Sequence, residues 1–234
     1  MGDVNQYEFV RRMAGDLEGP FLEIGSHDYG STQDLRPLFS SAEQDPGHYV
    51  GADLLPGDGV DVAIDLTRPF ADVNAALNGR RFGTIFCLSV LEHCAQPFAM
   101  ADNMTQLLTP GGKVVISAPF AWKFHGYPSD YWRFTQEGIR KLFPGIQFDD
   151  GDCFAVTSQA GDFRSADADL GRISLSGGHY RKRGEWLRAV GVAAIRACGR
   201  LGLFRWLTGY RYVMPPTNVM MVGTARECSA SKAA

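Results

Sequence analysis

The chain has 234 residues, enough for one α/β domain with a substantial core. With 45% hydrophobic and 21% charged residues it has the composition of an ordinary globular protein, and a net charge of −3 gives no general attraction to nucleic acid. No run of about 18 apolar residues is present that could span a bilayer, and the first residues lack the apolar stretch of a signal peptide. The five cysteines lack the spacing of metal ligands, so we expect a reduced, cytoplasmic protein without a zinc site.

Apolar runs alternate with helical patterns along the first half of the chain. The pattern predicts a helix over 4–17 with Val4, Tyr7, Val10 and Met13 on one face. It predicts strands at 21–24, 49–52, 60–64, 82–89 and 113–117, separated by helices at about 32–39, 69–77 and 97–108. This alternation with short connections predicts a doubly wound α/β fold with a parallel sheet.

The pattern changes after Pro119. Residues 121–135 form an aromatic, turn-rich loop after the carboxyl end of a strand, where doubly wound folds bind ligands. We then expect a helix at 135–143, strands at 146–156 and 218–225, a polar loop at 158–183 and a helical pattern at 185–207 that Gly191, Gly199 or Gly202 could interrupt. The sequence therefore predicts one domain over 1–234, with a helical insertion at about 158–212 before the last strand.

Positive charge is concentrated near the end of the chain. Residues 180–212 contain eight basic residues and one acid, Glu185, which gives +7 and leaves −10 for the remainder. An amphipathic helix of this kind could lie on an anionic membrane surface through residues 184–207. The alternative is a helical cap packed on the sheet, whose arginines are simply solvated.

The first two strands carry the pattern of a nucleotide site. FLEIGSHDYG, residues 21–30, is a short strand that runs into a glycine turn, and YVGADLL places Asp53 at the end of the next strand. A strand, a glycine turn, a helix and a second strand tipped by a carboxylate form half of a nucleotide-binding βαβ unit. We therefore expect a cofactor of the adenosine type.

Five motifs in order make the chain resemble a class I S-adenosylmethionine-dependent methyltransferase. FLEIGSHDYG stands at the glycine loop of that family, GADLL at its second-strand acid, VDVAIDLTRPF at its third strand, FGTIFCLSVLEHCAQP at its fourth strand with Leu-Glu-His, and LLTPGGKVVISAPF at its Pro-Gly-Gly turn and fifth strand. The resemblance implies a mostly parallel, seven-stranded sheet with helices on both faces, the Rossmann-like methyltransferase fold. His27 and Tyr29 replace glycines of the family, which disfavours a dinucleotide more than S-adenosylmethionine, because only the dinucleotide has a pyrophosphate.

The same resemblance implies S-adenosyl-L-methionine as the cofactor and a set of residues that seat it. Glu23, Gly25 and Ser26 would lie at its methionine end, Asp53 and Leu54 at the ribose, Asp65 and Leu66 at the adenine, and Leu88 and Ser89 at the sulfonium. Three of these residues have a simpler alternative: Gly25 could serve a tight turn, Asp53 could be an exposed loop acid, and Asp65 could cap the following helix.

A hydroxyl acceptor would additionally need a group that takes its proton. His93, just after the fourth strand, is the first candidate, and His125 in the loop above the sheet is the second. Asp130 could orient either histidine, bind a sugar hydroxyl or pair with Arg133. Tyr127, Tyr131 and Trp132 offer flat faces for a sugar ring, or a hydrophobic lid over the cofactor. No metal is expected, because the acids do not cluster.

The sequence therefore predicts an O-methyltransferase of glycan biosynthesis that acts on a hydroxyl of a sugar or polysaccharide precursor. It acts in the cytoplasm, with peripheral contact to the inner face of the membrane as an additional expectation. The alternative is a non-catalytic binding or membrane-adaptor protein with the same fold. An NAD-type oxidoreductase is disfavoured because the sequence lacks a glycine-rich phosphate turn and a Tyr-x-x-x-Lys pair. The acceptor atom and the oligomeric state remain open.

Overall fold

The computed structural model describes residues 4–28, 30, 34–39, 46–126, 128–157, 159–165, 172–203 and 205–226. These residues divide into two compact units, which are described separately below. The first unit is Met1–Ala166 with Pro216–Ala234, and the second is Asp167–Pro215. Tyr29, Tyr127 and the predicted helix start at 32 lie outside the described residues.

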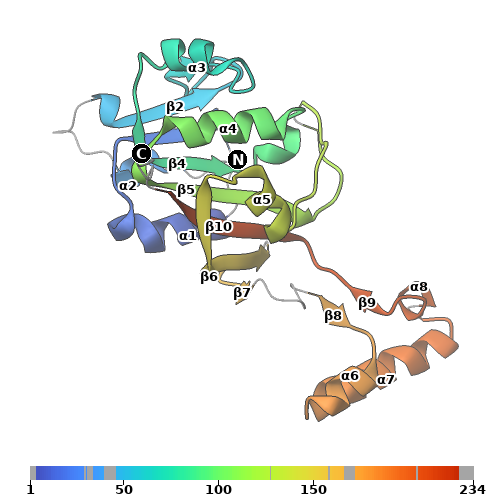
Figure 1. Cartoon of the computed structure of the whole chain (residues 1–234). Coiled ribbons are helices and arrows are strands. Elements are labelled where there is room, and N and C mark those ends of the chain that lie inside the picture. The colour runs from blue at the N-terminus through green and yellow to red at the C-terminus, as the bar shows by residue number, and fades with distance from the viewer. Residues whose placement is uncertain are drawn as a thin grey trace, which may run out of the picture. The chain divides into compact units, whose positions relative to one another are not determined.

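The first unit is built on an eight-stranded sheet (Figure 1). The strand order is β3 (Val62–Ala63), β2 (Tyr49–Asp53), β1 (Phe21–Ile24), β4 (Phe82–Leu88), β5 (Leu108–Ala121), β10 (Thr217–Ala225), β6 (Ile146–Thr157) and β7 (Phe163–Ser165). The first five strands are parallel, whereas β10 runs antiparallel to both of its neighbours. The predicted Rossmann-like fold is confirmed, with eight strands in place of seven because β7 adds an edge strand.

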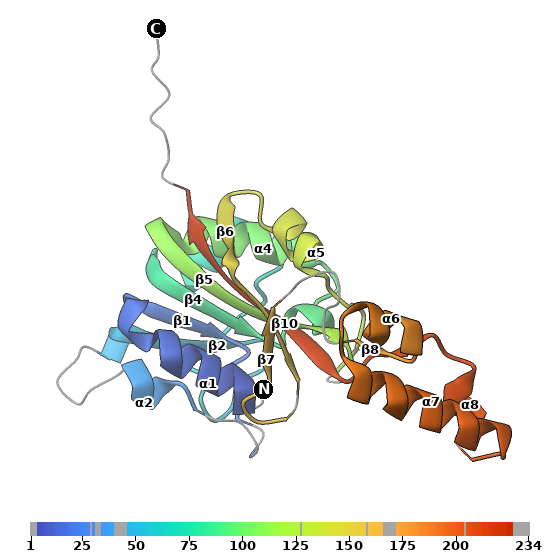
Figure 2. The same cartoon turned by 90° about the horizontal axis from the view of Figure 1, so that it is seen from below.

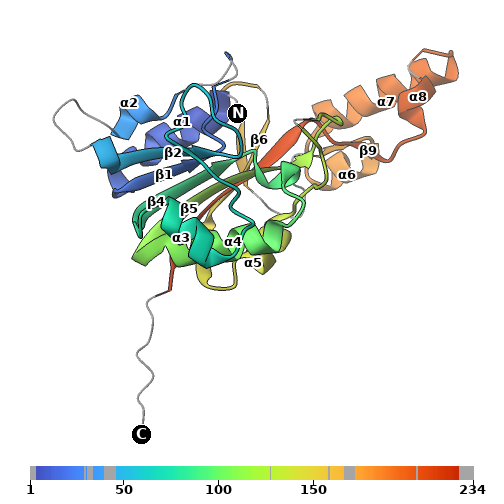
Figure 3. The same ribbon diagram turned by 90° about the horizontal axis from the view of Figure 1, so that it is seen from above.

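Helices cover both faces of this sheet. One face carries α1 (Val4–Met13) and α2 (Arg36–Phe39), and the other carries α3 (Phe70–Ala76), α4 (Pro97–Leu107) and α5 (Gln136–Leu142), as Figures 2 and 3 show. Thr135 caps α5 by accepting a hydrogen bond from the amide of Gly138 at 3.0 Å. Short 3₁₀ turns complete the unit at η1 (Ala14–Asp16), η2 (Pro46–His48) and η3 (Leu91–His93).

The central strands divide their side chains between the two faces. In β4, Ile85 and Cys87 join the core on the α3–α5 side, whereas Phe86 and Leu88 join the core beneath α1 and α2. Side chains on both faces of β4 are buried, so the sequence of this strand is one continuous apolar run. This explains why FGTIFCL is recognisable as a central strand from sequence alone.

The predicted face of the first helix is correct in part, because Val10 is buried and Tyr7 and Met13 pack against the same core. The structure buries Asn5, Gln6, Phe9 and Val10 and leaves Val4 41% exposed. Asn5 can be buried because its amide donates to the carbonyl oxygens of Thr157 and Gln159. Since apolar periodicity counts every amide as solvent-facing, it does not include Asn5 and Gln6 in the buried face.

The second unit contains α6 (Gly177–Lys182), α7 (Trp186–Arg200), α8 (Arg205–Thr208) and a small hairpin of β8 (Ile173–Ser174) with β9 (Tyr212–Val213). The expectation of a loop over 158–183 is therefore wrong in part, because β7, β8 and α6 lie within it. The predicted interruption of the later helix is found near Gly202, whose φ of +89° favours glycine. Whether the units form one domain stays a prediction.

No helix in the described ranges is both long enough and apolar enough to cross a bilayer.

Candidate functional site

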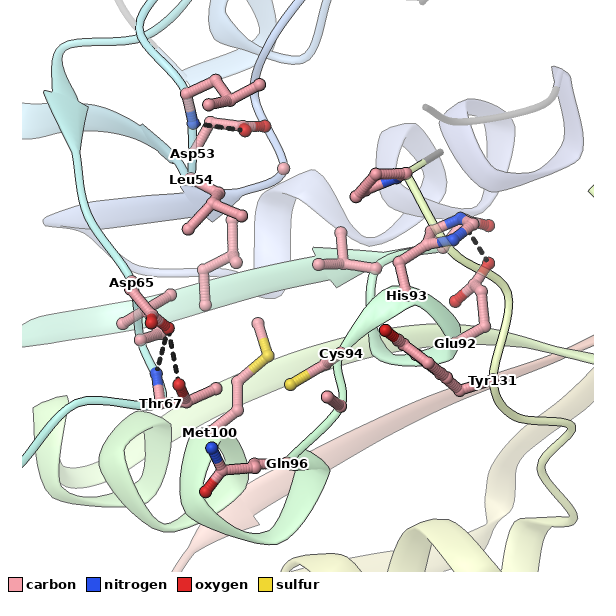
Figure 4. A pocket seen from close by; sticks show the side chains of 18 of the residues that line it. Asp53, Leu54, Asp65, Thr67, Glu92, His93, Cys94, Gln96, Met100 and Tyr131 are labelled. Carbon is pink, nitrogen blue, oxygen red and sulfur yellow. Dashed lines mark hydrogen bonds and ion pairs between the residues drawn. The ribbon is translucent and has the colours of Figure 1, made fainter. Parts of the chain in front are cut away.

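A cavity of about 690 Å³ lies at the carboxyl ends of β1, β2 and β4 (Figure 4). Its lining residues all belong to the first unit. A cavity of this size is typical for a cofactor or a small molecule, and its position is where doubly wound folds bind ligands. This cavity is the candidate site.

Gly25 lines the cavity where β1 ends. Its φ is +80°, and its amide donates to the carbonyl oxygen of Ala52 at 2.8 Å. A β-carbon at this position would collide with the side chain of Val90. Glycine is therefore required by both the backbone conformation and the space available, and the turn presents bare backbone to the cavity.

Two predicted carboxylates lie in the same part of the cavity. Asp53 ends β2 and accepts hydrogen bonds from the amides of His27 at 3.4 Å and Leu55 at 3.2 Å. Asp65 accepts from the amide and the hydroxyl of Thr67, at 2.9 and 2.6 Å. Pro69 occupies the N-cap position of α3 and makes no side-chain cap, so Asp65 shapes the turn before that helix instead of capping it. Figure 4 shows Asp53, Leu54 and Asp65 along one side of the cavity.

Of the other residues predicted to bind the cofactor, some line the cavity and some do not. Leu66 and Ser89 line the cavity, whereas Glu23, Ser26 and Leu88 lie outside its lining. Glu23 accepts a hydrogen bond from the hydroxyl of Tyr49 at 2.6 Å, and burial raises its pKa. Leu88 packs in the core on the α1 and α2 side of the sheet.

The histidine that replaces a glycine of the family's loop does not line the cavity. The imidazole of His27 packs against Gly57, so closely that a β-carbon at Gly57 would have no room. The other replacement, Tyr29, lies outside the described residues. The cavity is thus compatible with the larger side chain at position 27.

His93 lies on the opposite side of the cavity, in the turn that follows β4. Its Nδ1 is 2.5 Å from the carbonyl oxygen of Ser129. Because a carbonyl only accepts hydrogen bonds, Nδ1 carries the proton of the neutral ring and Nε2 keeps a lone pair. Burial lowers the pKa of His93, which favours this neutral form.

Glu92 is a residue to which the sequence gives no role. Its Oε1 is 3.9 Å from Nε2 of His93, and its side chain is 1% exposed. Its Oε2 has no hydrogen-bond partner among the described residues, and burial raises the pKa of Glu92 to about 7. A carboxylate in such surroundings is typical of functional sites, and only its burial reveals it.

The raised pKa of Glu92 has a consequence for stability. The folded state holds this proton up to about pH 7, whereas the unfolded chain releases it near its ordinary pKa of 4.5. Stability therefore falls as pH rises between these values. Between about pH 4 and about pH 8 the wild type should lose up to about 3 kcal/mol of unfolding free energy that Glu92→Gln does not lose. The stability of the variant relative to the wild type should therefore rise by that amount.

Urea unfolding at both pH values measures this difference. Glu137→Gln, at an exposed glutamate of α5, is the matched control and should follow the wild type. An equal effect of Glu92→Gln at both pH values would show that Glu92 does not hold a proton at neutral pH.

Asp130 organises the loop that carries His125. Its carboxylate, 1% exposed, accepts from the backbone amide of His125 at 2.9 Å and lies 3.2 Å from Nδ1 of that ring. It also pairs with Arg133, with Oδ2 2.7 Å from a guanidinium nitrogen, and this contact holds the pKa of Asp130 below its usual range. Orientation of a histidine and pairing with Arg133 are thus combined in one side chain, which lies outside the cavity lining.

The two histidines face each other at the cavity. The rings of His93 and His125 are 5.0 Å apart with an interplanar angle of 80°. The loop is held against the turn after β4, because the amide of Tyr131 donates to the carbonyl oxygen of Glu92 and the indole of Trp132 donates to that of Cys94, both at 2.8 Å. Both candidate bases therefore line one cavity.

A metal ion could also be held here. Potential ligand atoms of Glu92, His93 and His125 lie within 4.8 Å of one another. The expectation of no metal rests on the scattered acids and does not consider imidazoles. It stays a prediction.

Sequence reasoning missed Gln6, which lines the cavity from α1. Its amide donates to the hydroxyls of Ser89 at 2.7 Å and Ser117 at 2.6 Å. Ser89 has a φ of +58°, a conformation that is uncommon for residues other than glycine and often found at functional sites. A polar residue within a helix that packs on a sheet is the signal that could have identified Gln6.

Solved structures resemble this chain, whereas its sequence matches no known family model. No protein-family model matches the sequence, and no curated protein matches it. The structure is similar to that of 1,6-didemethyltoxoflavin-N1-methyltransferase from Burkholderia thailandensis, solved with 1,6-didemethyltoxoflavin and S-adenosylhomocysteine. The identity is 13%, the match covers 95% of this chain and 77% of that chain, and the TM-score is 0.53.

A second similar structure is the N-methyltransferase NodS from Bradyrhizobium japonicum WM9 in complex with S-adenosylhomocysteine, with 12% identity, coverage of 95% and 86%, and a TM-score of 0.48. A third is the StiE O-methyltransferase, with 15% identity, coverage of 96% and 74%, and a TM-score of 0.43. From the first of these three likenesses, the chain has the Rossmann-like fold of class I methyltransferases.

Proposed function

We propose that the protein transfers a methyl group from S-adenosylmethionine to a small acceptor, and that the acceptor atom is a hydroxyl oxygen of a sugar or polysaccharide precursor. One observation carries the proposal. A single cavity at the strand ends has Asp53 and Asp65 on one side and the Glu92–His93 pair on the other.

The residues on the first side fit the proposed cofactor. Asp53 at the tip of β2 would accept hydrogen bonds from the ribose hydroxyls, and Asp65 would accept one from the adenine amino group. Leu54, Leu66 and Met100 supply apolar surface for the adenine ring. The bare backbone at Gly25 would leave room for the methionine end, with Glu23, Ser26 and Leu88 supporting the site from behind. When bound, S-adenosylmethionine supplies an activated methyl group on a sulfonium.

The residues on the second side would handle the proton. His93 has an unprotonated Nε2, which would take the proton of the acceptor hydroxyl when its oxygen receives the methyl group that the bound cofactor supplies. Above about pH 7, where Glu92 is ionised, its carboxylate lies 3.9 Å from Nε2 and would stabilise the imidazolium that results. The products are a methyl ether and S-adenosylhomocysteine. His125, held by Asp130, is the alternative base.

The acceptor side is flanked by aromatic surface. Trp122 and Tyr131 both line the cavity, as His125 does. Flat aromatic faces suit the C–H faces of a sugar ring, and this supports a carbohydrate acceptor. Trp132 remains outside the lining, where its indole holds the loop to Cys94.

The proposal is tested by binding and turnover on the purified chain. Calorimetry should detect binding of both S-adenosylmethionine and S-adenosylhomocysteine, and a labelled methyl group should then appear on a hydroxyl within a panel of sugars and nucleotide sugars. The reaction should persist in EDTA. Absence of binding would remove the enzymatic function, and binding without turnover on any acceptor would favour the non-catalytic binding protein. Label on a nitrogen would correct the acceptor, and loss in EDTA would indicate a metal at Glu92, His93 and His125.

A further inference from the structure

The second unit has a surface that the proposed reaction does not use. Its longest helix is α7, drawn in orange in Figure 1. One side of α7 packs within the unit, where Ala189 and Val192 contact Tyr180 of α6. Gly199 lies against Thr208 of α8, with no room for a β-carbon. These contacts define the inner face of the helix.

The opposite face of α7 is apolar and exposed. At about 100° per residue, its members fall within an arc of about 120°. We call this face the apolar stripe of α7, and it consists of Trp186, Leu187, Val190, Ala193, Ala194 and Ala197. Trp186, Leu187 and Val190 are 64%, 90% and 65% exposed. An exposed stripe of this length marks an interaction surface.

The unit that carries the stripe is rich in positive charge. Residues 172–215 contain nine basic residues and a single acid, Glu185, and that acid already pairs with Arg183 and Arg188. By the same helical geometry, Arg200 borders one edge of the stripe, whereas Arg196 lies toward the inner face and donates to the carbonyl oxygen of Leu175 at 3.1 Å. Since the whole chain carries −3, the remainder is strongly acidic. The stripe thus belongs to a locally cationic unit.

We propose that the second unit docks on the surface of an anionic lipid bilayer, with the apolar stripe of α7 among the lipid headgroups and Arg200, with other basic side chains of the unit, on their phosphates. A helix with an apolar face and a basic border is suited to lie in the plane of such an interface. Trp186 and Trp206, the latter 68% exposed, have the amphipathic rings that membrane interfaces favour.

The charge of the second unit favours a bilayer over two other occupants of the stripe, a second copy of the chain and a nucleic acid. A second copy would bring two cationic units together, and their repulsion opposes such a dimer. A nucleic acid would require basic side chains at the centre of the contact, where the stripe is apolar. An anionic bilayer satisfies both the apolar centre and the basic border.

Co-sedimentation of the full chain with vesicles tests the proposal. Binding is expected to vesicles of phosphatidylcholine that contain phosphatidylglycerol, and to be at least about tenfold weaker to phosphatidylcholine alone. Binding should also weaken at about 0.5 M salt, because screening shortens the reach of the arginines. Leu187→Ser combined with Val190→Ser should lower the partition coefficient at least about tenfold, and Arg200→Gln about fivefold.

Phe98→Ser is the matched control, because Phe98 lies in α4 of the first unit and is 62% exposed, almost as much as Trp186. It should leave vesicle binding unchanged, and circular dichroism should show that all variants are folded. No sedimentation with anionic vesicles at low salt would overturn the proposal. Equal loss from Phe98→Ser and from the stripe variant would also overturn it, since binding would then not be specific to α7.

Discussion

Replacing His93 with glutamine is expected to lower kcat for methyl transfer to a hydroxyl about 10²–10⁴-fold, the usual contribution of a general base. Glutamine retains polar contacts near the Ser129 carbonyl but cannot accept the acceptor's proton at neutral pH. Cofactor affinity should not change, because His93 lies across the cavity from Asp53 and Asp65. Single-turnover kinetics with labelled S-adenosylmethionine, together with calorimetry, measure both quantities.

The pH profile provides a second readout for the same variant. Burial lowers the pKa of His93 below its ordinary 6.5, so the ring is neutral and active at neutral pH and becomes protonated only on acidification. The wild-type rate should therefore fall as pH drops through this lowered value, and the residual rate of His93→Gln should lack this fall. His179→Gln, in α6 of the second unit, is the control. Full activity of His93→Gln with loss in His125→Gln would assign the base to His125.

The positions of the central strands along the chain and the edge of the sheet that carries the cavity could be predicted because they depend on local signals. A buried parallel strand reads as an apolar run, and a glycine with positive φ or an acid at a strand tip marks the edge where ligands bind. Phe82–Leu88, Gly25 and Asp53 all carry such signals, and all lie where the sequence predicts.

The features that the sequence did not reveal depend on contacts between distant segments. Glu92 is unusual only because the fold buries it, and burial is not a property of its neighbours in sequence. Gln6 reaches Ser89 and Ser117 from a helix at the start of the chain. Its side chain is polar, so the apolar period assigned it to solvent.

Asp130 has two partners that the sequence presents as alternatives. The sequence offers a histidine partner or an arginine partner, since each lies within a few residues. A carboxylate has two oxygens and several lone pairs, so the folded loop uses both partners at once. Residue types alone indicate the possible partners of Asp130, but they do not indicate that both contacts form at the same time.

Asp53→Ala is expected to weaken S-adenosylmethionine binding about 10–150-fold, because a hydrogen bond to a charged group contributes about 1.5–3 kcal/mol. The proposed ribose contact places this loss in the dissociation constant measured by calorimetry, with S-adenosylhomocysteine affected equally. Asp53 also accepts the amides of His27 and Leu55, so truncation could loosen those loops. Asp53→Asn, which keeps an acceptor oxygen without the charge, should give an intermediate loss.

Asp72→Ala is the matched control for that loss. Asp72 is an exposed acid of α3, 3.7 Å from the guanidinium of Arg68, and lies outside the cavity lining. Because exposed ion pairs contribute little, its removal should change cofactor affinity by no more than about twofold. If Asp53→Ala binds as tightly as Asp72→Ala, the carboxylate at the tip of β2 does not contact the ribose. The cofactor would then have to bind in another register along the strand ends, with Asp65 as the remaining acidic contact in the same part of the cavity.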